Sequence, residues 1–325
     1  MLTTLALILL KALAFAIALI LGAAVELLME RKVLGYFQYR VGPNRVGPWG
    51  VLQPIADVVK MLFKEDLIPR DADNLVFRIA PMIAFFTALA VYVVIPVAPG
   101  WHMSDPNAGI LVFLAIGSMG IYGVALGGWA SQSKYTLLGS MRATAQMISY
   151  ELSMGMAVIG VILMAGSVSL TKIVEAQAGG IYGYYWLWQL PGFFVFFMSA
   201  LAETSRTPFD LPEAETELVG GFNTEYAGMR FGLFFLGEIV HLLNMASMIT
   251  LLYLGGWNTL PFLSFLPPIA SFLLKACFMI FVFMWIRVTW PRMRYDRLMS
   301  FGWKVMLPLA AANLLLTAIY VALWA

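Results

Sequence analysis

The chain has 325 residues, of which 61% are hydrophobic and only 12% are charged. A soluble globular protein carries about a quarter charged residues, so this composition excludes a soluble domain and indicates an integral membrane protein. The apolar runs are continuous rather than alternating, which predicts transmembrane helices and excludes a β-barrel. We expect residues 1–325 to form a single all-α, polytopic membrane domain, with no nucleic-acid partner.

Eight apolar runs are long enough to cross a bilayer, because a spanning helix needs roughly 20 residues. The first run does not resemble a cleaved signal peptide, since its basic flank follows the apolar residues and Lys11 interrupts them. In chain order the predicted spans are 3–29, 75–97, 108–130, 141–165, 186–202, 231–255, 269–288 and 302–323.

The segment 49–66 is predicted to be an amphipathic helix. Its apolar residues recur with helical spacing from Val51 to Phe63, and polar residues such as Asp57 and Lys60 lie between them. It is too short and too charged to cross the membrane, so we expect it to lie along the membrane surface. A surface anchor without chemistry is an equal alternative for this segment taken alone.

Basic residues are distributed unevenly between the two sides of these spans. Lysines and arginines gather in the connections 31–74, 204–230 and 289–301 and around 131–142, whereas the opposite connections hold only Lys172. Because cytoplasmic loops carry the excess of basic residues, we expect these connections on the cytoplasmic (or matrix) side and both termini on the opposite side, which is the periplasm in a bacterium.

The connection 204–230 concentrates negative charge beside the bilayer. Five carboxylates lie here against two arginines, and a loop that only joined two helices would not need them. Three of the glutamates alternate with small residues, so they can face a common polar volume or another subunit. We therefore take this segment as the candidate functional centre; its acidic residues are Asp210, Glu213, Glu215, Glu217 and Glu225.

Ionisable residues also occur within the predicted spans, where they are expensive and are functional hypotheses by default. Glu26 and Glu203 lie near span ends, where a carboxylate can reach the interface or a neighbouring arginine. Glu151 and Glu238 lie well inside their spans, and a row of such groups predicts a proton path. The alternative is a set of ion pairs with Lys11 and Lys275.

The chain is poor in ligands for redox cofactors. Iron–sulfur clusters need about four thiolates and haem needs axial ligands, whereas the sequence offers Cys277, His102 and His241. Glu238 and His241 form a Glu-x-x-His pair, but a di-iron site needs two such pairs and further carboxylates. We expect no bound metal or redox cofactor, so electrons would come from a partner.

Four motifs together identify a family. They are ERKVLGYFQYRVGPNRVGPWGVLQPIADVVKMLFKE, GWASQSKYTLLGSMRATAQMISYE, LAETSRTPFDLPEAETELVGGFNTEYAGM and PRMRYDRLMSFGWK, and they cover nearly the whole chain in order. The sequence resembles the H subunit family of bacterial NADH:quinone oxidoreductase, which corresponds to subunit 1 of mitochondrial complex I. The resemblance implies eight spans, with spans two to six similar to half of an antiporter-like repeat, in a bacterial inner membrane.

The resemblance also implies a function. The chain would dock against a peripheral arm whose subunits hold FMN and iron–sulfur clusters, and its substrate would be a quinone such as ubiquinone. Implied quinone-chamber residues are Glu30, Arg31, Arg40, Asp57, Arg206, Asp210, Glu213 and Glu225. The implied proton path comprises Glu151, Glu203, Glu213, Glu215, Glu217, Glu225 and Glu238.

Two other functions stay open at this point. Related membrane subunits anchor hydrogenases and ferredoxin- or coenzyme-dependent dehydrogenases, which would keep the fold and change the chemistry. A secondary transporter working alone would show broken helices at corresponding positions of two inverted halves. Pro191 is the clearest breaker inside a predicted span, and no clear pair of corresponding breaks accompanies it, which argues against the transporter.

Overall fold

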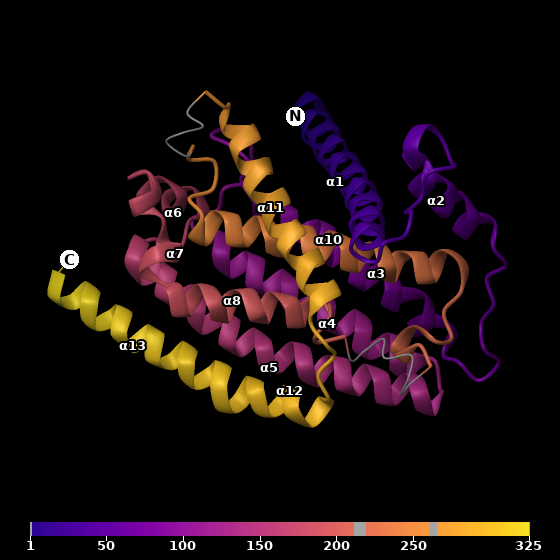
Figure 1. Ribbon diagram of the computed structural model, residues 1–325. Coiled ribbons are helices and arrows are strands. Elements are labelled where there is room, and N and C mark those ends of the chain that lie inside the picture. The colour runs from indigo at the N-terminus through magenta and orange to yellow at the C-terminus, as the bar shows by residue number, and fades with distance from the viewer. Residues whose placement is uncertain (1, 211–218, 260–264, 325) are drawn as a thin grey trace.

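The computed structural model describes residues 2–210, 219–259 and 265–324, and within them all regular secondary structure is helical (Figure 1). In these ranges seven helical stretches are long and apolar enough to cross a membrane. The sequence-based prediction of an all-helical, multi-pass membrane protein is therefore confirmed. The seven stretches are α1 (Leu2–Phe37), α3 (Asn74–Val91), α4 (Gly109–Ala130), α5 (Lys134–Ala165), α10 (Gly228–Tyr253), α11 (Pro268–Thr289) and Tyr295–Leu323.

The predicted span 186–202 is shorter than the others. It divides at Gln189 into α7 (Tyr185–Trp188) and α8 (Leu190–Glu203), and Pro191 lies in the first turn of α8, where a proline is tolerated. The 14 residues of α8 extend about 21 Å at the α-helical rise, against a hydrocarbon core of about 30 Å. Nevertheless α8 is a core helix, because Val195, Phe196 and Leu201 are fully buried.

Two helices extend beyond their apolar segments on the side where basic residues gather. Helix α1 continues through Glu30, Arg31 and Lys32 to Phe37, and α5 begins at Lys134 rather than at Met141. Hydropathy marks where a helix leaves an apolar environment, whereas the helix itself ends only where its backbone hydrogen bonds end. As a result the charged residues after position 29 are held on the same rigid helix as the apolar ones.

The last membrane stretch contains a local irregularity. Helix α12 (Tyr295–Phe301) passes through a π-helical turn, Gly302–Met306, into α13 (Leu307–Trp324). Pro308 in the first turn of α13 has no backbone N–H to donate to the preceding turn, and the wider π turn accommodates this loss. The helix therefore continues to the end of the described chain.

The helices form a bundle crossed by two steeply inclined helices. In Figure 1, α1 and α11 run across the long helices α5, α8, α10 and α13 rather than along them. Helix α2 (Gln53–Phe63) lies beside the end of α1 and packs against α1 and α10. Its residues Ile55, Leu62 and Phe63 are exposed, so the predicted amphipathic helix is present with an apolar face free for lipid.

Small residues allow α3, α4 and α5 to pack closely. A Cβ atom on Gly123 would lie 2.7 Å from the backbone nitrogen of Ala84, and one on Gly128 would lie 2.2 Å from the Cβ of Ser140. Small residues at such contacts are typical of membrane helix pairs, where close backbone approach replaces the hydrophobic driving force. This packing fixes the positions of α3, α4 and α5 around a cavity between the helices that is described below.

Candidate functional site

A buried carboxylate joins three distant parts of the chain at the end of α1. Glu30 is 5% exposed, and its Oε1 accepts hydrogen bonds from Arg206 at 2.6 Å and from Arg287. Arg206 follows α8, and Arg287 lies in the last turn of α11. A buried charge needs an opposite charge and hydrogen bonds to be tolerated, and two guanidinium groups supply both.

The backbone after α8 is shaped so that Arg206 can reach α1. Ser205 adopts a left-handed conformation with φ of 51°, which costs a non-glycine residue of order 1–3 kcal/mol. The side-chain amide of the buried Gln146 donates to the carbonyl oxygens of Ala202 at 2.7 Å and Phe209 at 2.8 Å. These two bonds fasten both ends of the 202–209 turn to α5 and so compensate for the strained residue.

Two further ion pairs continue the cluster. Asp210 pairs with Arg292 at 2.7 Å, and Arg31 pairs with Asp57 of α2, which also accepts from Gln53 at 3.0 Å. The result is a set of contacts between α1, α2, the segment after α8 and the end of α11. We call it the inner ion-pair network; it comprises Glu30, Arg31, Asp57, Arg206, Asp210, Arg287 and Arg292.

Two cavities lie at the surface near the end of α1, and the network borders the smaller of them through Arg31. Arg40, which is exposed, lines both of them, and Arg31 lines the smaller one. The larger cavity, of about 630 Å³, combines cationic and aromatic side chains, and the smaller measures about 260 Å³. The larger is lined by Lys32, Tyr36, Tyr39, Arg40, Val41, Gly42, Pro43, Asn44 and Trp49.

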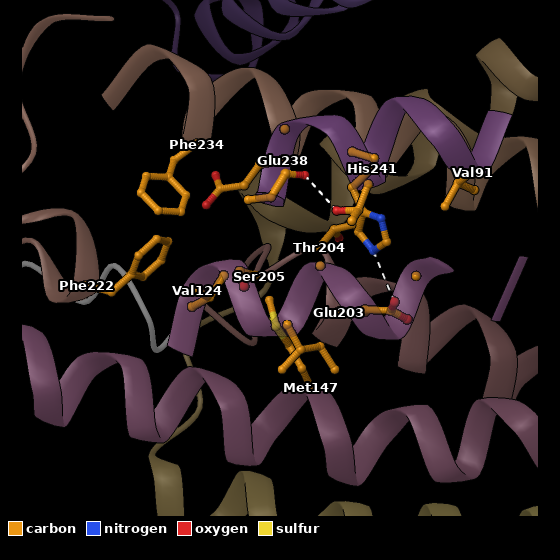
Figure 2. A pocket seen from close by; sticks show the side chains of 17 residues that line it. Val91, Val124, Met147, Glu203, Thr204, Ser205, Phe222, Phe234, Glu238 and His241 are labelled. Carbon is orange, nitrogen blue, oxygen red and sulfur yellow. Dashed lines mark hydrogen bonds and ion pairs between the residues drawn. The ribbon is translucent and has the colours of Figure 1, made fainter. Parts of the chain in front are cut away.

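A separate cavity lies between the helices of the bundle. We call it the interior cavity; its volume is about 60 Å³ and its walls come from α3, α4, α5, α8, η4 (Gly221–Asn223) and α10. Figure 2 shows Glu203 and His241 together at one end, whereas Glu238 extends toward Phe222 and Phe234. The sequence analysis singled out all three polar residues, but only the fold places them around one space.

In and beside the interior cavity, the carboxylates contact a histidine and a serine rather than arginines. His241 Nε2 lies 3.2 Å from Glu203 Oε1, and the Glu203 side chain is 7% exposed. The hydroxyl of Ser118 on α4 donates to Glu151 on α5. Glu151 is also within electrostatic range of Glu203 and His241. The arrangement is a line of acid–base groups through α5, α8 and α10.

Two polar neighbours of Glu151 in the sequence bind backbone carbonyl oxygens elsewhere: Gln146 donates to Ala202, and Tyr150 donates to Leu298 at 3.0 Å. The alternative that Lys275 forms an ion pair with a buried glutamate was wrong. Lys275, considered as an ion-pair partner for buried glutamates, donates to Tyr184 Oη at 3.2 Å and to the carbonyl oxygens of Leu254, Gly256 and Asn258. Lys275 of α11 thus satisfies carbonyl oxygens of the C-cap and of the turn that follows α10.

The remaining candidates differ in their surroundings. Glu225 is half-buried before α10 and does not line the interior cavity. Glu26 is 3% exposed, and neither carboxylate oxygen has a hydrogen-bond partner among the described residues; it is buried rather than reaching the interface. Glu213, Glu215 and Glu217 lie outside the described residues.

Sequence reasoning missed the arginine partners. The sequence analysis used Arg287 and Arg292 only as basic residues that indicate the orientation of the chain. In the structure they bind Glu30 and Asp210, respectively. Glu30 and Arg287 are 257 positions apart, so no local spacing could have paired them. In the described ranges no group of three or more histidine, cysteine or acidic side chains is arranged to hold a metal ion.

These features define a class: a multi-pass helical membrane protein whose acidic and basic residues converge from α1, α2, α8, α10 and α11. The sequence model described as NADH dehydrogenase matches residues 10–318. On this match and on the relatives below, the chain belongs to the H subunit family of NADH-quinone oxidoreductase. The family resemblance found in the four sequence motifs is confirmed.

Curated relatives match over nearly their full length. The chain is 62% identical over 319 residues to NADH-quinone oxidoreductase H subunit 1 of Symbiobacterium thermophilum, covering 97% of this chain and 96% of the relative. It is 50% identical to the NADH-quinone oxidoreductase H subunit of Rhodospirillum centenum, covering 96% and 93%. For the H subunit of Bacillus cytotoxicus the identity is 52%, covering 90% and 87%.

Proposed function

We propose that this chain is the membrane subunit that forms part of the quinone chamber in a proton-translocating NADH:quinone oxidoreductase. The observation that carries this proposal is the inner ion-pair network, which joins α1, α2, the segment after α8 and α11 beside an open cavity. An amphiphilic quinone needs an apolar approach from lipid and a polar end where its oxygens are protonated. The exposed apolar face of α2 and the neighbouring charged groups offer these two environments.

The chamber residues in this proposal are Glu30, Arg31, Arg40, Asp57, Arg206 and Asp210, together with Glu213 and Glu225. Reduction of a quinone to a quinol adds two electrons and two protons. The electrons enter from a partner protein, because this chain is proposed to hold no redox cofactor. Iron–sulfur clusters and FMN then belong to the peripheral arm, and the chamber must lie where that arm docks.

The proton path in this proposal starts at the same segment. Glu203, the last residue of α8, lies three positions before Arg206 of the inner ion-pair network and also borders the interior cavity. One short turn therefore connects the proposed chamber to the line of Glu203, Glu151 and Glu238. Protonation changes near the quinone can reach these carboxylates through the position of this turn. The acidic residues Glu213, Glu215, Glu217 and Glu225 complete the proposed path.

The proposed orientation places the inner ion-pair network on the cytoplasmic side and both termini in the periplasm, with α8 completing an eight-membered set of membrane helices. Asn107 and Lys134 are both exposed, beyond opposite ends of α4. With Cys277→Ala as the background, Asn107→Cys should react with an impermeant maleimide from the periplasm and Lys134→Cys from the cytoplasm. Labelling of both from one side would overturn this orientation.

The chamber is tested by Asp210→Asn in membranes that contain the whole complex. This change removes the charge facing Arg292, and we expect quinone reduction to fall while NADH oxidation by a water-soluble artificial acceptor is retained, because that acceptor takes its electrons upstream. Asp296→Asn is a matched control, since the side chains of Arg294 and Asp296 in that pair are 77% and 70% exposed. If both activities of Asp210→Asn fell together and the peripheral arm were absent, the segment would be an assembly contact instead.

A further inference from the structure

The contact between Glu203 and His241 differs from the other ion pairs of the buried region. Glu30 binds arginines, which do not release a proton in proteins, whereas Glu203 binds an imidazole at 3.2 Å. Imidazole can accept a proton at one ring nitrogen and release one from the other. The second oxygen of Glu203, Oε2, is buried and has no hydrogen-bond partner among the described residues. One oxygen of Glu203 is therefore left without a hydrogen bond from the described residues.

The interior cavity adds a place for the proton to go. It measures about 60 Å³, and roughly 10–15 Å³ of such volume is enough for one water molecule. His241 and Glu238 both line it, from successive turns of α10 (Figure 2). The imidazole consequently has Glu203 on one side and, on the other, a cavity that it shares with Glu238.

The charged neighbours of His241 are few. Glu203 faces it from the end of α8, Glu151 lies within electrostatic range on α5, and Glu238 shares α10. The surfaces of α3 and α4 that face the cavity contribute the Thr87 hydroxyl and otherwise apolar residues or glycines. On α1, which packs against α10, the buried carboxylate is Glu26. Among the described residues, carboxylates therefore outnumber cations around this imidazole.

We propose that His241 is a proton-carrying residue between Glu203 and Glu238; this inference rests on the proton path proposed above. In the forward step the O–H bond of a protonated Glu203 breaks and a bond from Nε2 to that proton forms, leaving a carboxylate beside an imidazolium. The N–H bond at Nδ1 of the imidazolium then breaks, and the proton passes through water in the cavity to the carboxylate of Glu238, where an O–H bond forms. A rotation or tautomer exchange of the ring restores the acceptor at Nε2. One proton crosses from α8 to α10, and no electrons are transferred.

The test compares His241→Gln with His102→Gln in inverted membrane vesicles that contain the whole complex. Glutamine keeps an N–H donor for Glu203 but cannot carry a proton, and His102, the only other histidine, is exposed in the connection between α3 and α4. We expect His241→Gln to lower coupled quinone reduction at least about tenfold; positioned proton-transfer groups typically contribute about 10²–10⁴-fold. Its pH profile should lose one titration step, and His102→Gln should leave rate and profile unchanged.

A second pair of variants separates a carrier from a structural partner. His241→Lys keeps a cation beside Glu203 but holds its proton tightly, so we expect assembly with impaired coupling. The double variant Glu203→Gln/His241→Gln should be no slower than Glu203→Gln alone, because both changes interrupt one transfer. NADH oxidation by the artificial acceptor reports the amount of assembled complex in each case.

The outcomes separate the two proposals. If His241→Gln or His241→Lys kept the unaltered chain's turnover, pH profile and proton-to-electron ratio, His241 would be a structural ion-pair partner and this inference would be wrong. If Glu203→Gln also kept the turnover, the pH profile and the proton-to-electron ratio, the proposed proton path would be wrong as well. If His241→Gln did not assemble, full coupling in His241→Lys would overturn the inference, and assembled but uncoupled membranes would support it.

Discussion

The inner ion-pair network and the interior cavity handle buried carboxylates in opposite ways. In the network every carboxylate contacts an arginine: Glu30 with two, Asp57 and Asp210 with one each. In and beside the interior cavity the identified partners are the imidazole of His241, which binds Glu203, and the hydroxyl of Ser118, which binds Glu151. The two regions are only three residues apart in sequence, at Glu203 and Arg206, yet their chemistry differs.

This difference suits the two regions to different roles: the ion-pair network keeps fixed charges, and the region of the interior cavity can exchange protons. An arginine stays protonated, so each pair of the network keeps a fixed charge and a fixed geometry. Serine and histidine impose no permanent charge, and a carboxylate bound to them can gain or lose a proton at smaller electrostatic cost. A protein that positions a polar substrate and passes on protons needs both kinds of region, in contact with each other.

The largest effect should follow removal of an arginine from the network. Arg206→Met leaves Glu30 buried with Arg287 alone, and breaking a buried ion pair costs about 3–5 kcal/mol. We expect much less assembled complex on native gels and a lower temperature of thermal inactivation. Arg294→Met, in an exposed pair, should change neither. If Arg206→Met assembled normally, the burial of Glu30 would not require both arginines, and this prediction would be wrong.

A carboxylate of the proposed proton path should behave differently from a network arginine. Glu151→Gln retains the size and hydrogen bonding of the side chain and loses the proton, so assembly should be largely preserved. We expect coupled quinone reduction to fall about tenfold, equivalent to roughly 1.4 kcal/mol, with a lower proton-to-electron ratio. Glu175→Gln, an exposed glutamate of α6 (Leu170–Ala176), provides the control. If Glu151→Gln instead reduced the amount of assembled complex, Glu151 would be a structural residue. The proposed difference between this region and the ion-pair network would then be wrong.

Substitutions at the exposed edge of the network should destabilise the protein less than substitutions at its buried centre. The Arg292 side chain is 46% exposed in its pair with Asp210, and partly exposed pairs contribute up to about 1 kcal/mol because water screens them. Arg292→Met should therefore lower the thermal inactivation temperature by far less than Arg206→Met. Equal losses in the two variants would contradict the ranking of these pairs by burial.

The smallest effect is expected for a hydroxyl of the cavity region. Ser118→Ala removes the hydrogen bond to Glu151, a change of about 0.5–1.5 kcal/mol. Its effect on coupling should disappear in the Glu151→Gln background, because the hydroxyl acts through that carboxylate. Additive losses in the double variant would mean that Ser118 contributes to helix packing instead.

Much of the fold follows from hydropathy, and the exceptions have physical causes. The α4 helix begins within a residue of its predicted start, because an apolar run between polar turns has only one way to satisfy its backbone in lipid. The C-terminal end of α1 and the start of α5 were not predicted, because charged residues can continue a helix. The short α8 was not predicted, because a proline can begin a helix. Likewise Glu203 was predicted as a site residue, but its contact with His241 was not, because the two lie on separate helices.

By itself the sequence determined that this is a helical membrane protein of the H subunit family, with too few ligand residues for a redox centre and with carboxylates in unusual places. Those conclusions depend on composition and on local order, which every segment carries with it. Only the tertiary structure decided which carboxylates meet arginines and which meet serine or histidine. Partners such as Glu30 and Arg287 are separated by most of the chain, and their contact depends on the steep crossing of α1 and α11 over the bundle (Figure 1).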